Sequence, residues 1–306
     1  MRYVVTGAAG FIGSQLAETL VDSGHAVVAV DCLTDYYSVE EKEANAAGLE
    51  LQRQDLSETD LSLDGVDGVF HLAGQPGVRS FGDVFPLYVR HNVLASQRVF
   101  AAAAAAGVRV VFASTSTVYG DAASYPTREN AVPFPVSPYG ITKLAAEHLA
   151  HAYARSFGLD AVVLRYFSVY GPRQRPDMFF RRVVDALAAG TAFEVYGDGL
   201  QSRSFTYVAD VVAATIAAMQ HAPGGGLYNV GGGEEATVRD AIDLLQELAD
   251  RALDVRYGPH AEGDVVRTCA DTSRIEAELG WKPRTTLREG LASEWDWASS
   301  AQPAVR

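Results

Sequence analysis

The sequence is poor in cysteine and in positive charge. Cys32 and Cys269 are its only cysteines, too few for the disulfide framework of a secreted domain and without the spacing of a zinc site. Lys and Arg number 25 against 38 Asp and Glu, a formal net charge of -13 that argues against sequence-independent binding of nucleic acid. We therefore expect free thiols, no bound metal, no nucleic-acid partner and a cytoplasmic location.

Long apolar runs and a signal peptide are also missing. No apolar stretch approaches the ~18 residues of a membrane span, and the first residues already resemble a buried strand with no charged-then-apolar leader before them. We expect no membrane partner. Apolar residues make up 48% and charged residues 21% of the chain, a globular balance, so the whole chain should fold.

Short apolar runs alternate with helical patterns in the first half of the chain. The predicted strands are Tyr3–Val5, Ala26–Val30, Gly68–Leu72, Val108–Ala113 and Ala161–Leu164, and the predicted helices are Ile12–Ser23, Ser96–Ala106 and Tyr139–Phe157. Strands that are apolar throughout are buried on both faces, and their alternation with helices indicates a parallel sheet. We predict an α/β fold: a doubly wound parallel sheet of the Rossmann type with a smaller C-terminal substrate-binding lobe.

The rhythm changes after Pro172. Helices are predicted near Met178–Ala189 and Val238–Leu253, with shorter strands between them. We assign residues 1–171, together with roughly 206–232, to the first domain, and roughly 172–205 and 233–306 to the second.

A glycine-rich turn joins the first predicted strand to the first predicted helix. Gly7, Gly10 and Gly13 have the spacing G-x-x-G-x-x-G, with Phe11 and Ile12 between the last two. Glycine allows backbone amides and the helix N-terminus to approach a pyrophosphate closely. The position of this turn predicts a dinucleotide-binding site.

An acidic residue ends the second predicted strand. Asp31 follows Gly13 by eighteen residues, where a carboxylate accepts hydrogen bonds from the adenosine ribose and repels a 2′-phosphate. This favours NAD over NADP. Asp55 and Leu56, after the third predicted strand, are candidates for contact with the adenine, and the alternative for Asp55 is a solvated surface turn.

Tyr139 and Lys143 stand at i and i+4 on a predicted helix, so their side chains point into one site. A neighbouring ammonium and a positive nicotinamide ring would lower the tyrosine pKa from about 10 towards working pH. Tyr139 is therefore a candidate general base and acid. A hydroxyl-rich segment, Ser114–Gly120, leaves the carboxyl end of a buried strand, where ligands bind to such sheets.

Four motifs together resemble the extended short-chain dehydrogenase/reductases, specifically their nucleotide-sugar epimerases and dehydratases. The motifs are TGAAGFIG in the glycine turn, HLAG at His71–Gly74, STSTVYG at Ser114–Gly120 and YGITK at Tyr139–Lys143. The resemblance extends over nearly the entire chain. It implies that the first domain binds NAD and the second a nucleotide sugar, and that the protein is a homodimer.

The resemblance also assigns roles to residues. The catalytic triad it implies is Thr115, Tyr139 and Lys143, with Lys143 also binding the nicotinamide ribose. Leu72 and Ala73 would bind NAD, and the backbone of His71 would line the NAD groove. His71, in an apolar neighbourhood, is interpreted as a packed strand residue.

The reaction is indicated by the residues after Thr115. Family members that remove water carry an acidic pair there, whereas this chain has Ser116 and Thr117, so we predict epimerisation at C4 through a transient 4-keto sugar. Ser168, the R-P-D-M run at 175–178 and Asp-Tyr-Tyr at 35–37 resemble UDP-glucuronate 4-epimerases. UDP-glucuronate is therefore the predicted substrate.

The substrate-binding residues follow from this hypothesis. A glucuronate carboxylate needs a guanidinium and hydroxyl donors, which Arg175, Ser168, Ser116 and Thr115 offer. Ser114, next to Thr115 in sequence, is also a candidate for substrate binding. By resemblance alone, Arg203 and Arg267 would clamp the UDP diphosphate, and Arg79 would lie at the sugar-facing mouth of the site.

Three alternatives stay open. UDP-glucuronate decarboxylation uses the same 4-keto intermediate, and UDP-glucose 4-epimerisation uses the same triad, so only the pocket separates these activities. A non-catalytic NAD-binding regulator with this fold is the third. The intact triad speaks against it, because such regulators commonly lack part of the triad, and the fold alone does not decide.

Overall fold

The structure is a computed structural model of the chain, and it describes residues 1–78, 82–260 and 265–301. The strands are β1 (Arg2–Thr6), β2 (Ala26–Asp31), β3 (Leu51–Arg53), β4 (Gly68–His71), β5 (Arg109–Thr115), β6 (Ala161–Tyr166), β7 (Val169–Tyr170), β8 (Phe193–Tyr196), β9 (Ser202–Ser204), β10 (Thr206–Tyr207), β11 (Leu227–Val230), β12 (Glu235–Thr237), β13 (Val255–Gly258) and β14 (Arg267–Thr268). The α-helices are α1 (Phe11–Asp22), α2 (Val39–Asn45), α3 (Phe85–Tyr88), α4 (Ala95–Ala106), α5 (Pro138–Phe157), α6 (Phe179–Ala189), α7 (Val208–His221), α8 (Val238–Ala249), α9 (Ser273–Leu279) and α10 (Leu287–Ala301). Short helical segments η1 (Gly82–Val84), η2 (Val89–Leu94) and η3 (Ser116–Tyr119) complete them.

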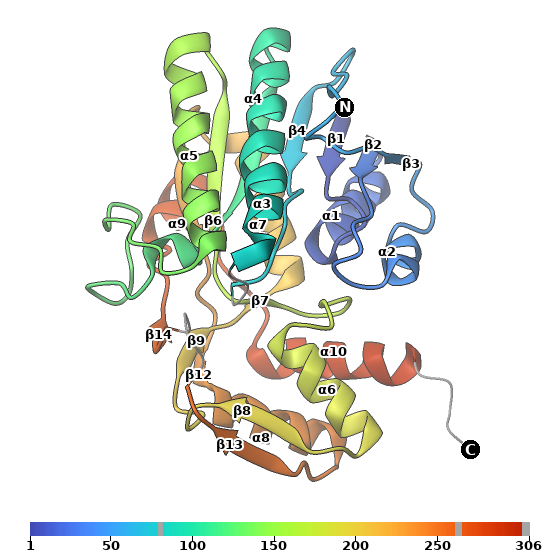
Figure 1. The fold of residues 1–306 in the computed structure, drawn as a ribbon, viewed down its shortest axis with the longest axis vertical. Coiled ribbons are helices and arrows are strands. Elements are labelled where there is room, and N and C mark those ends of the chain that lie inside the picture. The colour runs from blue at the N-terminus through green and yellow to red at the C-terminus, as the bar shows by residue number, and fades with distance from the viewer. Residues whose placement is uncertain (79–81, 261–264, 302–306) are drawn as a thin grey trace.

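A seven-stranded sheet forms the upper half of the molecule in Figure 1, in the order β11-β6-β5-β4-β1-β2-β3. Every pair of neighbours in it is parallel. The order reverses between β1 and β4, and ligands of such sheets bind outside the carboxyl ends of the strands at this reversal. The predicted doubly wound parallel α/β fold is confirmed.

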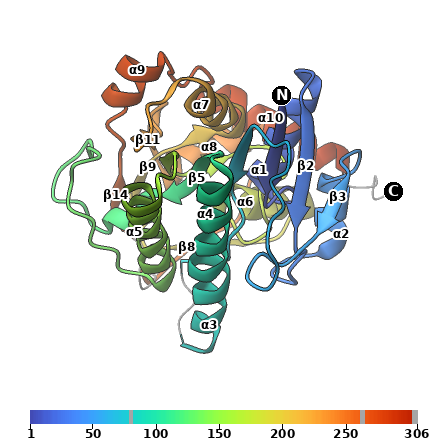
Figure 2. The same ribbon diagram turned by 90° about the horizontal axis from the view of Figure 1, so that it is seen from above.

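Helices cover both faces of this sheet, and alternate side chains of one strand reach different layers. Tyr3 and Val5 of β1 pack in the layer of α1 and α7, whereas Val4 packs in the layer of α4 and α5. Figure 2 shows the two layers from above. Burial on both faces explains why the sheet strands are apolar throughout.

The lower half of the molecule in Figure 1 contains α6, α8, α10 and the parallel pair β8 and β13. A third apolar cluster lies here, with Phe180 and Val183 of α6 packed with Ile242 of α8 and Leu291 of α10. Two further short sheets, β10-β7 and β12-β9-β14, lie outside the main sheet. No helix among the described residues is long and apolar enough to cross a membrane.

The predicted elements occur within a few residues of their expected bounds, and the differences have local causes. Helix α8 ends at Ala249 and not at Leu253, because Asp250 adopts a left-handed conformation (φ 50°) that ends the helix. Strands β5 and β6 each run two residues further than expected, because Ser114 and Thr115 pair with Arg165 and Tyr166. Helix α7 packs on α1, and β11 joins the main sheet beside β6.

His71 ends β4 inside the core, as interpreted from the sequence, and its side chain is fully buried. Its Nδ1 lies 2.7 Å from the Thr6 hydroxyl and its Nε2 lies 3.0 Å from the Ser96 hydroxyl. Since Ser96 donates its own proton to the Asn92 carbonyl, the neutral ring carries its proton on Nε2 and accepts at Nδ1. Thr6 in turn accepts from the Ala73 amide at 3.2 Å, which ties this histidine to the wall of the groove described below.

Burial, reinforced by the charge of Lys143, lowers the pKa of His71 to about 3. We predict that the free energy of unfolding falls as the pH drops below about 6.5, because the unfolded histidine takes up a proton that the folded one refuses. By pH 4.5 this loss is on the order of 3 kcal/mol. Urea unfolding at pH 7.5 and 4.5 measures it. In His71→Phe the free energy of unfolding should fall by this much less between the two pH values. An equal fall in both proteins would contradict the prediction.

Candidate active site

Two cavities open at the carboxyl ends of the sheet strands and meet at Tyr139. The first is a groove, and residues predicted from the sequence to bind cofactor line it: Gly7, Gly10, Phe11, Ile12, Gly13, Asp31, Asp55, Leu56, Leu72, Ala73, Tyr139 and Lys143. The second is a cavity of about 540 Å³, the size of a small-molecule site, and its lining includes Ser114, Thr115, Ser116, Ser168, Arg175 and Arg203. Tyr139, Ser114 and Arg175 line both.

The glycine turn is built by close backbone contacts. Gly7 has φ +71°, and a Cβ added to Gly13 would lie 2.0 Å from the Gly7 carbonyl oxygen, so only glycine fits there. Helix α1 begins after Gly10 without a side-chain cap. The amides of its first turn are therefore open to an anion such as a pyrophosphate, which is the fit expected for NAD.

Asp31 is held at the end of β2 by two backbone amides. Its Oδ2 accepts from the Ala9 amide at 3.1 Å and its Oδ1 from the Leu33 amide at 2.8 Å. A carboxylate has about four acceptor positions, so each oxygen keeps capacity for a ribose hydroxyl on the groove side.

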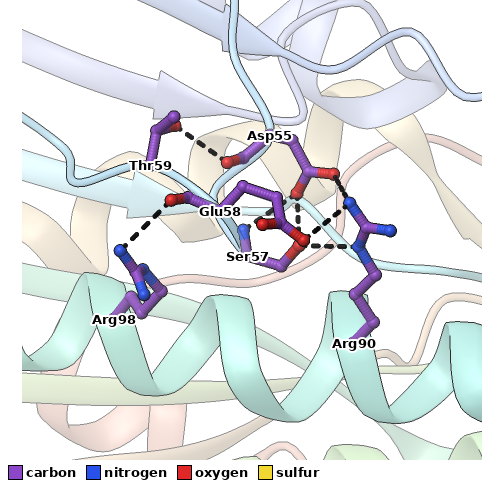
Figure 3. A network of polar contacts seen from close by, with 6 residues as sticks. All are labelled: Asp55, Ser57, Glu58, Thr59, Arg90 and Arg98. Carbon is purple, nitrogen blue, oxygen red and sulfur yellow. Dashed lines mark hydrogen bonds and ion pairs between the residues drawn. The ribbon is translucent and has the colours of Figure 1, made fainter.

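Asp55 follows β3, the strand next to β2, and is fixed by a polar network (Figure 3). Its Oδ1 accepts from the Ser57 amide and hydroxyl at 2.9 and 2.6 Å, and its Oδ2 from Arg90 at 2.6 Å. Arg90 also reaches Glu58 at 3.1 Å. Burial opposes ionisation, but these hydrogen bonds and the Arg90 charge lower the pKa of Asp55 below its usual value. Its carboxylate therefore stays ionised and in one place.

Helix α5 presents Tyr139 and Lys143 to the site. It begins at Pro138, and the hydroxyl of Ser137 caps it by accepting from the Gly140 amide at 3.1 Å. Burial raises the pKa of Tyr139, while the charge of Arg175 and a hydrogen bond with Thr115 lower it by less. In the chain alone burial outweighs the nearby cation, which is Arg175, and the lowering expected from an ammonium together with the nicotinamide ring stays a prediction.

Lys143 lies in an apolar environment with its Nζ 4.2 Å from the centre of the Phe112 ring. Burial lowers its pKa to about 7, and Glu147, one turn further along α5, opposes that shift. Glu147 forms a buried ion pair with Arg165 at 2.6 Å and accepts a hydrogen bond from Ser114. Sequence reasoning missed this pair, although its i+4 spacing from Lys143 was a usable signal.

Two more polar residues that the sequence did not reveal support the groove: Lys42 lines it, and Asn92 lies between the segment after β4 and α5. Lys42 is buried, donates to the Thr34 carbonyl at 2.5 Å and lies 4.5 Å from the centre of the Tyr37 ring. Asn92 accepts from the Gln75 amide at 2.7 Å and so fixes the segment after β4. Neither belongs to a pattern that distinguishes it from a surface residue.

Arg175 lies where the two cavities meet, with its side chain 21% exposed. Its Nε and Nη2 donate to the two carboxylate oxygens of Asp177 at 2.9 and 3.1 Å. Tyr36 donates to the same carboxylate at 3.1 Å. The two sequence motifs that contain these residues, Asp-Tyr-Tyr and R-P-D-M, therefore meet in space.

The residues expected at the UDP end differ in their placement. Arg203 lines the second cavity and donates to the carbonyls of Ser202 and Val265 at 2.8 and 2.6 Å. Arg267 pairs with Glu235 at 2.6 Å and is not among the residues that line the cavities. Arg79 lies outside the described residues. Within the described part of the chain, no group of three or more His, Cys, Asp or Glu side chains could hold a metal ion.

Known proteins resemble this chain along its length. Residues 3–231 match the model of the NAD dependent epimerase/dehydratase family. An uncharacterized UDP-glucose epimerase of Bacillus subtilis, YtcB, is 40% identical over 98% of both chains. The crystal structure of UDP-glucuronic acid 4-epimerase from Bacillus cereus in complex with UDP-glucuronic acid and NAD is 37% identical, with a TM-score of 0.95 over 99% of this chain and 100% of that one. MoeE5 in complex with UDP-glucuronic acid and NAD is 43% identical, with a TM-score of 0.89 and the same coverage.

Proposed function

Since the chain belongs to the NAD-dependent epimerase/dehydratase family, we propose that it is an enzyme that interconverts the C4 epimers of a UDP-sugar, UDP-glucuronate and UDP-galacturonate. NAD is the cofactor of the related structures, and the glycine turn, Asp31 and Asp55 fit it. The observation that carries the proposal is the position of Arg175, a guanidinium at the junction of the groove and the sugar cavity.

The triad side chains perform the proton transfer. Tyr139 takes the proton of the 4-hydroxyl and later returns it, and Thr115 holds the reacting oxygen by a hydrogen bond. Lys143 binds the nicotinamide ribose, and Arg175 is the cation whose charge acts on Tyr139. When bound, NAD supplies the hydride acceptor for C4 and a positive ring charge beside the phenol. Because burial raises the pKa of Tyr139, the charges of the bound state have to lower it.

Epimerisation requires that the 4-keto sugar present its other face before it is reduced again. In this proposal the sugar ring turns over in the cavity of about 540 Å³ while the UDP group stays anchored. Ser116 and Thr117, which line this cavity beside Thr115, are hydroxyl residues and offer no carboxyl group to eliminate water. This supports epimerisation over dehydration.

The glucuronate carboxylate is matched by one cation and several hydroxyls. Arg175, Ser168, Ser116 and Thr115 line the same cavity, which supports this proposal. A guanidinium and hydroxyls around a carboxylate form charge-assisted hydrogen bonds, which are stronger than neutral ones.

UDP-glucose is the second candidate substrate, and one observation favours it. Arg175 already has a carboxylate partner in Asp177, so its charge is balanced before any sugar binds. A neutral 6-hydroxymethyl group would then lie beside an ion pair and not beside an unpaired cation.

We expect the purified enzyme to convert UDP-glucuronate to UDP-galacturonate with a kcat/KM above that for UDP-glucose. The measurement incubates the protein with UDP-glucuronate, UDP-glucose and UDP-galactose and identifies the products by chromatography and mass. Formation of UDP-xylose from UDP-glucuronate would identify a decarboxylase. Turnover of UDP-glucose alone would overturn the glucuronate assignment, and no turnover of any of them would favour the regulator.

The homodimer, the cytoplasmic location and the division into two domains stay predictions. Exposed apolar side chains support the dimer: Phe85 and Leu87 of α3 are both 42% exposed, and Ile141 of α5 is 50% exposed. Helices α4 and α5 lie side by side (Figure 1). Two such helices from each subunit would cover one another's apolar positions.

A further inference from the structure

Asp177 occupies an unusual place for a carboxylate, inside the sugar cavity and opposite the cation proposed to bind a substrate carboxylate. It lines the second cavity with Tyr36 and Arg175, and its side chain is 39% exposed. Both of its oxygens are taken, one by Arg175 Nε and the other by Arg175 Nη2 and the Tyr36 hydroxyl.

Tyr36 fixes this carboxylate from another part of the chain. It follows β2 and reaches across 141 residues of sequence to donate its proton to Asp177. Burial, with the charge of Asp177, raises the pKa of Tyr36 to about 12, so the hydroxyl keeps the proton that it donates. Asp177 is therefore held by both Tyr36 and Arg175 before any sugar binds.

The pair leaves part of the guanidinium for a ligand. Asp177 uses the edge formed by Nε and Nη2, and no other described residue accepts a hydrogen bond from Nη1 of Arg175. The edge formed by Nη1 and Nη2 is thus available to a substrate carboxylate. Such a carboxylate would share the cation with Asp177 and be repelled by it.

We propose that Asp177 is a built-in counter-charge for Arg175 that sets the substrate range of the site, so that the enzyme binds neutral as well as acidic UDP-hexoses. This rests on the proposed function. A largely buried guanidinium facing a neutral sugar without a counter-charge is costly, and Asp177 removes that cost. For an acidic sugar Asp177 weakens binding, because two carboxylates then share one cation. Both effects move the preference towards neutral sugars.

The test is Asp177→Asn, which keeps the shape and a carbonyl acceptor for Arg175 but removes the charge. Dissociation constants of UDP-glucuronate and UDP-glucose are measured by calorimetry on the NAD-loaded protein. The ratio of the UDP-glucose constant to the UDP-glucuronate constant should rise by roughly tenfold or more in Asp177→Asn, the scale of a charge interaction at the edge of a protein.

Asp185→Asn is the matched control. Asp185 pairs with Arg181 at 3.0 Å in α6, its side chain is 42% exposed, and it does not line either cavity. Asp185→Asn removes one negative charge without changing the partner of Arg175. The ratio of the two dissociation constants should therefore stay within about twofold of wild type. Thermal melting and NAD content of both variants show whether they remain folded.

The outcomes separate this inference from the proposed function. If the wild type neither binds nor converts UDP-glucuronate, the proposed function fails. If it does, the inference is overturned by a wild type that does not bind UDP-glucose, by an unchanged ratio in Asp177→Asn, or by an equal shift in Asp185→Asn.

Discussion

Replacing Tyr139 by Phe is expected to lower the turnover of UDP-sugars by about 10²–10⁴-fold, the usual value of a general acid–base group. The change removes the hydroxyl that exchanges a proton with the sugar and keeps the ring. Tyr139 lines both cavities, at the place where the groove and the sugar cavity meet. Single-turnover and steady-state rates on UDP-glucuronate measure the loss.

NAD content separates a chemical role of Tyr139 from a structural one. The wild type should carry NAD when purified without added cofactor, since the reaction returns the cofactor to its starting state, and Tyr139→Phe should carry nearly as much. Tyr153→Phe is the control on the same helix: its hydroxyl binds Gln97, away from both cavities. A near-native rate in Tyr139→Phe, or an equal loss in Tyr153→Phe, would refute the catalytic role.

The groove for the cofactor could be predicted residue by residue because its signals are local. The glycine turn, the carboxylate at the end of β2 and the i, i+4 pair on α5 each depend on neighbours in sequence, and the parallel sheet brings the strand ends together. Gly7, Gly13, Asp31 and Lys143 accordingly all line one groove.

The sugar cavity was less predictable because its contacts join distant segments. Nothing in the sequence indicates that Tyr36 binds Asp177, since the contact depends on how the loop after β2 meets the segment before α6. The position of Arg267 also depends on contacts between distant segments. Strand β9 lies between β12 and β14, and this order places Arg267 beside Glu235, a partner far away in sequence.

Electrostatic shifts were the least predictable part of the site. The i, i+4 spacing suggests that Lys143 lowers the pKa of Tyr139, yet burial raises the pKa of the tyrosine and lowers that of the lysine. Burial is a property of the whole fold and no spacing in the sequence reports it.

The carboxylate of the substrate raises a chemical difficulty that Arg175 is proposed to solve. A 4-keto glucuronate is a β-keto acid, and it loses CO₂ readily when its C5–carboxylate bond lines up with the carbonyl π system. An epimerase has to prevent that alignment. A carboxylate gripped by Arg175 and by the hydroxyls of Ser168, Ser116 and Thr115 would be held with this bond near the carbonyl plane, where the released electrons cannot delocalise into the ketone.

Arg175→Ala should therefore change both the affinity and the product. Loss of charge-assisted hydrogen bonding costs roughly 1.5–3 kcal/mol, or about 10- to 150-fold in binding of UDP-glucuronate, and UDP-glucose should be affected far less. The freed carboxylate can rotate, so the remaining turnover should leak towards a pentose product and CO₂.

UDP-galacturonate and released CO₂ are followed together in the wild type, in Arg175→Ala and in the control Arg181→Ala. The guanidinium of Arg181 pairs with Asp185 outside both cavities. Because Arg175→Ala also uncovers the charge of Asp177, the double variant with Asp177→Asn shows how much of the lost affinity is repulsion. If Arg175→Ala epimerises UDP-glucuronate as well as the wild type and releases no CO₂, the carboxylate lies elsewhere and the glucuronate assignment loses its physical support.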